Sequence, residues 1–325
     1  MKKYLYLLLS VTLSLIICPL GVYTVSGMSS GKAPYNKEES LSESEIIKVF
    51  RADTGNVEEM NFRDYIIGVV AAEMPAEFHS EALSALAVSA STLARKNFLE
   101  GEDNSLSGAV ISTDPAIHQA YMTKDEMEEK WGKDFGKYYE KIAEAVDKSI
   151  GYSVTYEGEL ITAAYHAMST GITESAENVW SGEIPYLTEV KSEGDRLSPR
   201  YETTASVSNE EFIRIMSEEG ADFSDSDKIH IKDALYTKAG TLRSVTIGKR
   251  TFSGEKLRQL FNLRSPAIEI STDEKEVTFT VRGYGHGVGL SQYGADYYAK
   301  QGMTWEEIIK HYYKGVDIEK ADTFT

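Results

Sequence analysis

The sequence of 325 residues holds one cysteine, six histidines and seven prolines. A single cysteine excludes an internal disulfide and a metal cage of thiolates. Basic residues are scarce as well, because 34 lysines and arginines stand against 51 acidic residues and leave a net charge of −17. A chain this acidic is poorly suited to bind nucleic acid through bulk electrostatics. We therefore expect no nucleic-acid partner.

One long uncharged run is present, from Tyr4 to about Val25, directly after Lys2 and Lys3. About 20 such residues are enough to cross a bilayer as a helix. Lysines before the run favour a cytoplasmic N-terminus. We expect residues 1–25 to be a signal anchor in the cytoplasmic membrane, with the bulk of the chain outside. The alternative is a cleaved signal peptide, which has a shorter apolar stretch and a small-residue cleavage site.

Residues 26–44 are rich in Gly, Ser, Lys, Glu and Pro, which is typical of a linker. The rest mixes helical and strand patterns without a βαβ rhythm, so the expected fold class is α+β behind a transmembrane helix. We expect a core in two parts, residues 45–187 and 271–325, with a β-rich subdomain inserted at 188–270.

Hydrophobic periodicity and turn signals predict the individual elements. Strands are expected at 46–52, 242–247 and 277–281, and a hairpin at 152–156 and 160–166. Helices are expected at 62–73, 80–98, 124–150 with a break near 132–136, 292–300 and 305–313.

The helix expected at 62–73 carries a carboxylate on its apolar face. An apolar stripe runs from Phe62 to Val70 at i, i+3, i+4 spacing, and Glu73 continues it by one turn. Burial and the negative end of the helix dipole both disfavour the charged carboxylate and raise its pKa. Glu73 is therefore a candidate general acid. The alternative is that it turns outward where Pro75 interrupts the helix.

A second polar cluster follows the expected hairpin. It combines hydroxyl, imidazole, carboxylate and aromatic groups within a short stretch, a mixture that suits a carbohydrate groove but also occurs in ordinary loops. Its members are Tyr165, His166, Ser169, Glu174, Trp180 and Tyr186.

Glycine then occupies every second position from Gly283 to Gly289, around His286. The run fails the dinucleotide-binding spacing because Leu290 stands where the third glycine is needed. Such glycines allow the backbone to approach a ligand or to turn a tight corner. His118, His166 and His286 lack the spacing of metal ligands, so we expect no metal and no cofactor.

Taken together, these segments resemble the stage II sporulation protein D family, which includes the amidase enhancers. The resemblance covers roughly residues 45–318, and its last motif is the most specific. The matching segments are Glu73-Met74-Pro75-Ala76-Glu77-Phe78, Glu81-Ala82-Leu83, Tyr165-His166 with Ser169 and Gly171, Thr173-Glu174, Pro185-Tyr186-Leu187, residues 261–265, and Gly285-His286-Gly287-Val288-Gly289-Leu290-Ser291-Gln292-Tyr293-Gly294-Ala295.

The resemblance implies a lytic transglycosylase that cuts the β-1,4 bond after N-acetylmuramic acid in peptide-stripped peptidoglycan strands and leaves a 1,6-anhydro end. The family's catalytic acid falls on Glu73. The implied partners are the stage II sporulation proteins P, an amidase, and M, a polytopic membrane protein. The expected substrate-binding residues are Arg95, Tyr165, His166, Ser169, Glu174, Tyr186, His286 and Gln292.

This sequence departs from the family pattern in its second helix. The usual Ala-Arg-Thr is replaced by Ala90, Ser91 and Thr92. Arg95 lies one turn further on the same face, so we expect it to take over part of the role of the missing guanidinium. The alternative is a solvated surface arginine near the end of the helix. The alternative to an active enzyme is a wall-binding module that recruits or stimulates an amidase without cutting.

Overall fold

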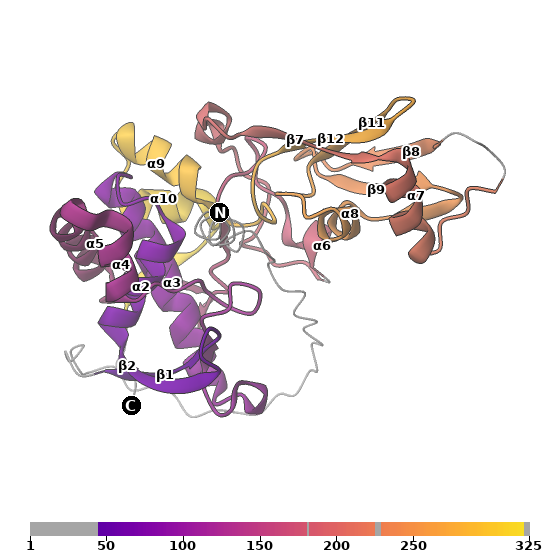
Figure 1. Cartoon of the computed structure of the whole chain (residues 1–325). Coiled ribbons are helices and arrows are strands. Elements are labelled where there is room, and N and C mark those ends of the chain that lie inside the picture. Colours follow the sequence, from indigo (N-terminus) through magenta and orange to yellow (C-terminus); the bar gives the residue numbers. More distant parts are fainter. Residues whose placement is uncertain (1–44, 181, 225–228, 322–325) are drawn as a thin grey trace.

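The computed structural model describes residues 45–321 except 181 and 225–228. The described chain forms two lobes that lie side by side (Figure 1). The first lobe is built from both ends of the described chain, and the second from the segment between them. Each lobe has its own cluster of buried apolar side chains.

Helix α3 (Ser80–Glu100) is the centre of the first lobe. Its many alanines and serines are buried, and their small size lets four helices approach closely. These neighbours are α2 (Phe62–Glu73), α5 (Phe135–Ser149), α9 (Gln292–Lys300) and α10 (Trp305–Tyr312). The predicted helices at these places are confirmed to within two residues at their ends, apart from the break before α5.

Helix α2 sets the position of Glu73. It begins at an Asn61 cap, whose side chain accepts a 3.2 Å hydrogen bond from the Asp64 N–H. The apolar stripe predicted from Phe62 to Val70 is buried. The helix ends at Met74, which is extended because Pro75 disfavours helical backbone in the residue before it.

The helical region predicted at 124–150 is interrupted, as expected. It consists of α4 (Lys124–Trp131), the 3-10 turn η2 (Gly132–Asp134) and α5. Gly132 has a φ of 50°, which ends α4 in the left-handed region.

Short sheets border these helices. β1 (Ile46–Arg51), confirmed as a strand, pairs antiparallel with β2 (Asn56–Asn61) and parallel with β3 (Ile111–Ser112). The remaining short elements of this lobe and its border are η1 (Asn104–Leu106), α6 (Ala176–Val179) and η3 (Glu193–Leu197).

The predicted hairpin is only partly correct. β4 (Tyr152–Tyr156) turns at Glu157 and Gly158 and pairs with β5 (Glu159–Leu160), and on its other edge with β14 (Asp317–Lys320). The second strand was expected at 160–166, but it ends at Leu160, and residues 161–164 are not in a strand. Residues 165 and 166 form a strand outside the hairpin.

These two residues form β6 (Tyr165–His166), which leaves the hairpin and pairs in parallel with β13 (Leu290–Ser291). The segment after the glycine-rich run therefore reaches β6 from a place more than a hundred residues away in the sequence. Such a long-range partner has no local sequence signal.

The second lobe packs two three-stranded sheets against two short helices (Figure 1). Phe212, Phe261 and Phe279 meet in its core, with ring centroids 4.7 to 6.2 Å apart. Its elements are β7 (Glu202–Ser208), α7 (Asn209–Glu218), β8 (Ile231–Tyr236), β9 (Leu242–Ile247), β10 (Arg250–Phe252), α8 (Gly254–Leu260), β11 (Ile268–Thr272) and β12 (Glu276–Arg282). The strands predicted at 242–247 and 277–281 are confirmed. The domain boundary expected at residue 270 lies within β11, and the apolar cluster of this lobe continues to Val281.

The expected fold class needs one correction. The membrane helix was expected at 1–25 and the linker at 26–44, and both lie outside the described residues. Within the described part of 45–321, no helix is both long enough and apolar enough to cross a bilayer. The structure therefore supports a mixed body of helices and strands and gives no membrane-spanning helix.

Candidate active site

Glu73, at the end of α2, lies between two hydrogen-bond donors from distant parts of the chain. The Ala120 N–H donates to Glu73 Oε1 and Gln292 Nε2 donates to Glu73 Oε2, both at 3.1 Å. The partly buried side chain therefore turns toward the rest of the protein at Pro75, not outward. Burial raises the pKa of Glu73, although the two donors partly counteract it by favouring the carboxylate. A carboxyl group of this kind is suited to keep a proton until a substrate takes it.

Gln292 reaches Glu73 because α9 begins there. Ser291 caps the helix by accepting a hydrogen bond from the Gly294 N–H at 3.2 Å. Gln292 is the first residue of the helix and is 4% exposed, so its amide is held in one place. The structure thus brings together two of the predicted site residues, Glu73 and Gln292, which are 219 positions apart in sequence.

Two tyrosines and a buried glutamine support this region. Gln119 accepts from the Tyr65 hydroxyl and donates to the Tyr165 hydroxyl, each at 3.1 Å. Burial, together with the nearby charge of Glu73, raises the pKa of both phenols, so they remain neutral. Tyr165, a predicted substrate-binding residue, therefore lies close enough to Glu73 to feel its charge. Gln119 was missed, because a lone glutamine in a loop gives no signal in a sequence.

The rings of His166, which follows Tyr165 in the chain, and His286 lie next to each other. Their ring centroids are 5.7 Å apart, and the ring of Trp180 is 5.3 Å from that of His286. His166 Nδ1 is 3.0 Å from the Val288 carbonyl, and His286 Nδ1 accepts from the Val288 N–H at 3.0 Å. Burial lowers the pKa of both imidazoles, that of His166 to about 4, so both are neutral at pH 7.

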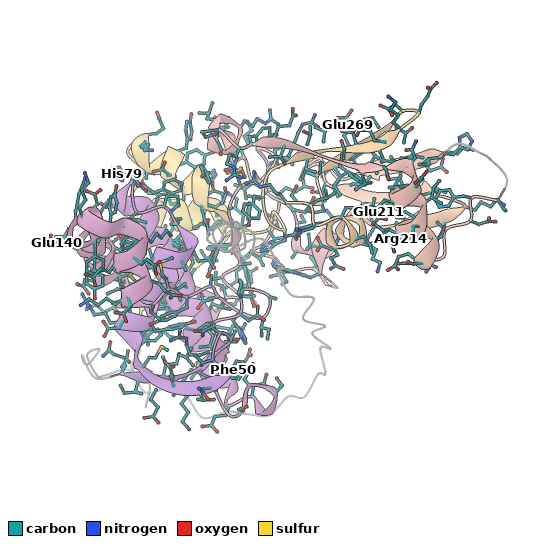
Figure 2. The ribbon with its side chains drawn as sticks, in the orientation of Figure 1. Phe50, His79, Glu140, Glu211, Arg214 and Glu269 are labelled. Carbon is teal, nitrogen blue, oxygen red and sulfur yellow. The ribbon has the colours of Figure 1, made fainter. Side chains whose placement is uncertain are left out.

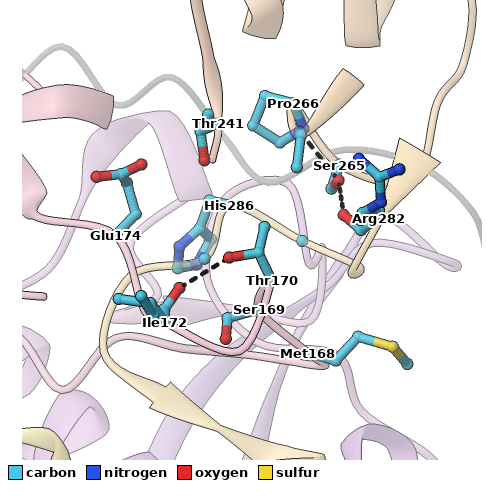
Figure 3. A pocket seen from close by; sticks show the side chains of 13 residues that line it. Met168, Ser169, Thr170, Ile172, Glu174, Thr241, Ser265, Pro266, Arg282 and His286 are labelled. Atoms are coloured by element: carbon cyan, nitrogen blue, oxygen red, sulfur yellow. Dashed lines mark hydrogen bonds between the residues drawn. The ribbon is translucent and has the colours of Figure 1, made fainter. Parts of the chain in front are cut away.

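Glu174 lines a narrow pocket with His286 at the boundary of the lobes (Figure 3). Its carboxylate accepts from Asn178 Nδ2 at 2.8 Å and from the Thr237 hydroxyl at 2.6 Å. The enclosed space is about 10 Å³, which is roughly the room of one water molecule. These predicted groove residues therefore form a packed junction rather than an open sugar site.

Ser169 belongs to a buried polar cluster around Asp195, which the sequence analysis missed. The Ser169 hydroxyl and backbone N–H donate to Asp195 Oδ2 at 2.5 and 2.7 Å, and the Ser291 hydroxyl donates to Asp195 Oδ1 at 2.5 Å. Desolvation raises the pKa of Asp195 to about 6. Through Ser291, which caps α9, this cluster helps position the helix that carries Gln292.

Arg95 does not take the place expected for it. It is 4% exposed and forms an ion pair with the buried Glu45 at 3.4 Å, and its guanidinium lies 4.7 Å from the centroid of the Phe62 ring. Phe62 and Glu73 are at opposite ends of α2, separated by about 16 Å at ~1.5 Å per residue. The idea that Arg95 replaces the family's guanidinium is therefore wrong. Ser91 is also buried, and its hydroxyl donates to the Val88 carbonyl at 3.1 Å.

Tyr186 is likewise part of the packing. Its hydroxyl accepts from the Thr162 N–H at 2.9 Å, and its ring centroid lies 5.4 Å from that of Tyr156. None of its printed contacts among the described residues involves Glu73.

The glycine-rich run turns a tight corner against the protein's own backbone. Gly283, Gly285, Gly287 and Gly289 all have φ between 76° and 101°. A Cβ on Gly289 would lie 2.1 Å from the Ala164 carbonyl oxygen. Of the two roles expected for these glycines, the structure favours the corner. Within the described residues, no group of three or more His, Cys, Asp or Glu side chains is placed to hold a metal ion.

Comparison with known proteins gives the family of this chain. Residues 51–156 match the family model described as Stage II sporulation protein, which defines the class. Stage II sporulation protein D of Bacillus amyloliquefaciens is 36% identical over 91% of this chain and 84% of its own length. Stage II sporulation protein D of Bacillus subtilis is 35% identical over 88% of this chain and 82% of its own. The chain therefore belongs to the stage II sporulation protein D family.

A more distant relative is the amidase enhancer of Bacillus subtilis. It is 25% identical over 77% of this chain, which spans 40% of that relative's length. The family resemblance inferred from the motifs is thus confirmed.

Proposed function

We propose that this protein is a lytic transglycosylase that cleaves the β-1,4 bond between N-acetylmuramic acid and N-acetylglucosamine in peptidoglycan strands. The observation that carries this proposal is the partly buried Glu73 with its raised pKa, held by donors from Ala120 and Gln292. A protonated carboxyl group is the acid that glycosidic bond cleavage requires.

Glu73 serves both steps of the proposed reaction. Its carboxyl group gives a proton to the glycosidic oxygen as the bond from the anomeric carbon to that oxygen breaks. The resulting carboxylate then takes the proton of the sugar's own 6-hydroxyl, while that oxygen bonds to the anomeric carbon and closes the 1,6-anhydro ring. Between the steps, the Ala120 N–H and the Gln292 amide stabilise the carboxylate.

The surroundings of Glu73 fit a mechanism with one carboxylate. Hydrolases that pair two acids place their carboxyl groups roughly 5 to 9.5 Å apart. Burial raises the pKa of Glu73, and the contacts that lower it come from the donors Ala120 and Gln292. The proposed reaction uses Glu73 for both proton transfers and the sugar's own 6-hydroxyl as the nucleophile.

Peptide-stripped strands test the proposal directly. The protein is incubated with them, and 1,6-anhydro ends are sought by mass spectrometry. Glu73→Gln removes the acidic proton and keeps the shape. Glu140→Gln is the matched control, because Glu140 is exposed on α5 (Figure 2). Anhydro product from the protein and from the control, but not from Glu73→Gln, is expected. Equal product from all three would contradict the proposal.

A second candidate is a module that binds the wall and stimulates an amidase without cutting. Two observations favour it: the family's arginine is replaced by the buried Ser91, and Arg95, one turn further on, is buried and paired with Glu45. The amidase enhancer among the relatives carries this role in its name. Stimulation of an amidase that survives in Glu73→Gln, with no anhydro product from the unmodified protein, would favour this candidate.

The place of action and the partners follow from the proposed substrate. We propose that the protein acts during engulfment at the outer face of the cytoplasmic membrane, where peptidoglycan lies. On the family resemblance, we propose the stage II sporulation proteins P and M as its partners. Cross-linking in sporulating cells, with each partner deleted in turn, tests this.

A further inference from the structure

A second pocket lies beside the Glu73 region and has not been used by the mechanism above. It encloses about 330 Å³, which is within the size range of small-molecule sites. Its walls come from the end of β1, the loop after β3 and the start of α4. The lining residues are Arg51, Ala52, Asp53, Thr113, Asp114, Pro115, Tyr121 and Glu126.

Tyr121 forms the wall nearest to α2. Its ring stacks on that of Tyr65 with centroids 5.8 Å apart and an angle of 11° between the planes. Gly68 makes this position available, because a Cβ there would lie 2.2 Å from Tyr121 Cε2. The contacts with α2 thus fix the position of the Tyr121 ring, which remains partly exposed toward the pocket.

The pocket is linked to Glu73 through the chain and along α2. Ala120, which donates to Glu73, directly precedes Tyr121 in the chain. Tyr65, which stacks on Tyr121, is eight residues before Glu73 on α2, or about 12 Å along the helix at ~1.5 Å per residue. A linear sugar chain held at Glu73 would therefore reach this pocket with a unit further along the strand, beyond the two sugars of the cleaved bond.

The charges of the pocket select against a carboxylate ligand. Three carboxylates, those of Asp53, Asp114 and Glu126, line it against one guanidinium. That guanidinium, of Arg51, is already engaged: Nε and Nη2 donate to Asp53 at 3.0 and 2.8 Å, and Nη1 to Glu58 at 3.3 Å. An anionic ligand would find the donors of Arg51 occupied and the remaining charge repulsive.

We propose that this pocket is a saccharide subsite for the neutral N-acetylhexosamine of the strand and that it rejects the carboxylate-bearing sugar. The carboxylates of the pocket accept hydrogen bonds from sugar hydroxyls, and the Tyr121 ring gives the sugar an apolar wall. A neutral sugar at this place fixes the register of the alternating strand relative to Glu73. The proposal rests on the proposed function, which it deepens by assigning a further sugar position on the strand.

Binding to the Glu73→Gln protein tests the subsite without cleavage. The two probes are the neutral trimer of N-acetylglucosamine and the same trimer with a lactyl ether carboxylate on each unit, titrated by calorimetry at pH 7 and low salt. We expect the neutral trimer to bind at least tenfold more tightly. Adding Tyr121→Ala should weaken its binding at least tenfold. Tyr236→Ala, which removes a half-exposed tyrosine from β8 in the other lobe, is the matched control and should change nothing.

A double variant tests whether the charge of the pocket sets the preference for the neutral trimer. Asp53→Asn with Asp114→Asn removes two negative charges, frees part of the Arg51 guanidinium and keeps the side-chain oxygen that accepts from the Ala116 N–H. The preference for the neutral trimer should fall below threefold in this variant. Asp222→Asn, which removes a carboxylate paired with Lys249 in the second lobe, should leave it unchanged.

Each contrary result overturns the proposal. Unchanged trimer binding in Tyr121→Ala, equal affinity of the unmodified pocket for both probes, or a free stem peptide that binds in a Tyr121-dependent way would each exclude a neutral-sugar subsite. These failures are separate from failure of the proposed function, which is decided by anhydro product from Glu73 and Glu73→Gln proteins.

Discussion

The regions around Glu73 and Asp195 both remove a carboxyl group from bulk water, but they differ in how many hydrogen-bond donors the protein provides to it. Asp195 is fully buried and accepts from two serine hydroxyls and a backbone N–H of the protein. Within the described part of the chain, Glu73 receives hydrogen bonds from two donors, and it remains partly exposed. A raised pKa occurs in both. It is access to an external molecule that separates a candidate catalytic group from a structural one.

The largest effect expected from this difference is on cleavage. Glu73→Gln should lower the rate by roughly 10²- to 10⁴-fold, the contribution of a positioned general acid, while strand binding remains. The rate of anhydro-end formation and the affinity for intact strands are the two measurements. A rate within threefold of the unmodified protein would remove Glu73 from the chemistry.

Arg95→Ala should destabilise the protein without touching the site. The change removes the cation that pairs with the buried Glu45, and losing one partner of a buried ion pair costs about 3–5 kcal/mol. Chemical denaturation measures the free energy of unfolding, and cleavage per folded molecule should stay unchanged.

Arg214→Ala is the control for this change. Arg214 pairs with Glu211 and Glu218 on the exposed face of α7 (Figure 2), so its loss should have no measurable effect on unfolding. A specific loss of cleavage in folded Arg95→Ala would show that Arg95 acts on the substrate after all.

Asp195→Asn should cost somewhat less, about 2–3 kcal/mol, because it leaves buried hydroxyl donors poorly paired. The raised pKa also determines how the stability changes with pH. Since the folded pKa of about 6 lies above the ordinary value of 3.8, the carboxyl group's favourable contribution is fully present below about pH 4 and is lost as the pH rises through 6. Urea unfolding between pH 4 and 7.5 should show this loss in the unmodified protein and not in Asp195→Asn. A parallel slope in both would contradict the raised pKa.

Gln292→Leu should produce the smallest effect, a shift in the pH profile of cleavage. The Gln292 amide favours the charged form of Glu73, so its removal should raise the pKa of Glu73 further. Activity, which needs the protonated acid, should then persist to a higher pH before it falls. An unshifted alkaline limb would show that Gln292 does not control this proton.

Local patterns were enough to predict most helices, but they left two orientations open for Glu73. The stripe from Phe62 to Val70 favours the inward one, and the contacts with Ala120 and Gln292 decide for it. Partners from distant segments could not be predicted: Gln119, Asp195 and the pairing of β6 with β13 depend on how the chain closes. Arg95 shows the opposite error, because helical spacing put it near the family position while burial against Glu45 decided its direction.

The closure of α9 onto the first lobe also has a consequence for the growing chain. Glu73 is made early, and the amide that binds it follows 219 residues later, together with the helices that complete the core around α3. A chain interrupted before Ser291 has neither the α9 cap nor this amide. Contacts of such sequence separation also slow folding. The candidate acid is thus completed late during biosynthesis, so fragments that end before Ser291 lack the assembled site.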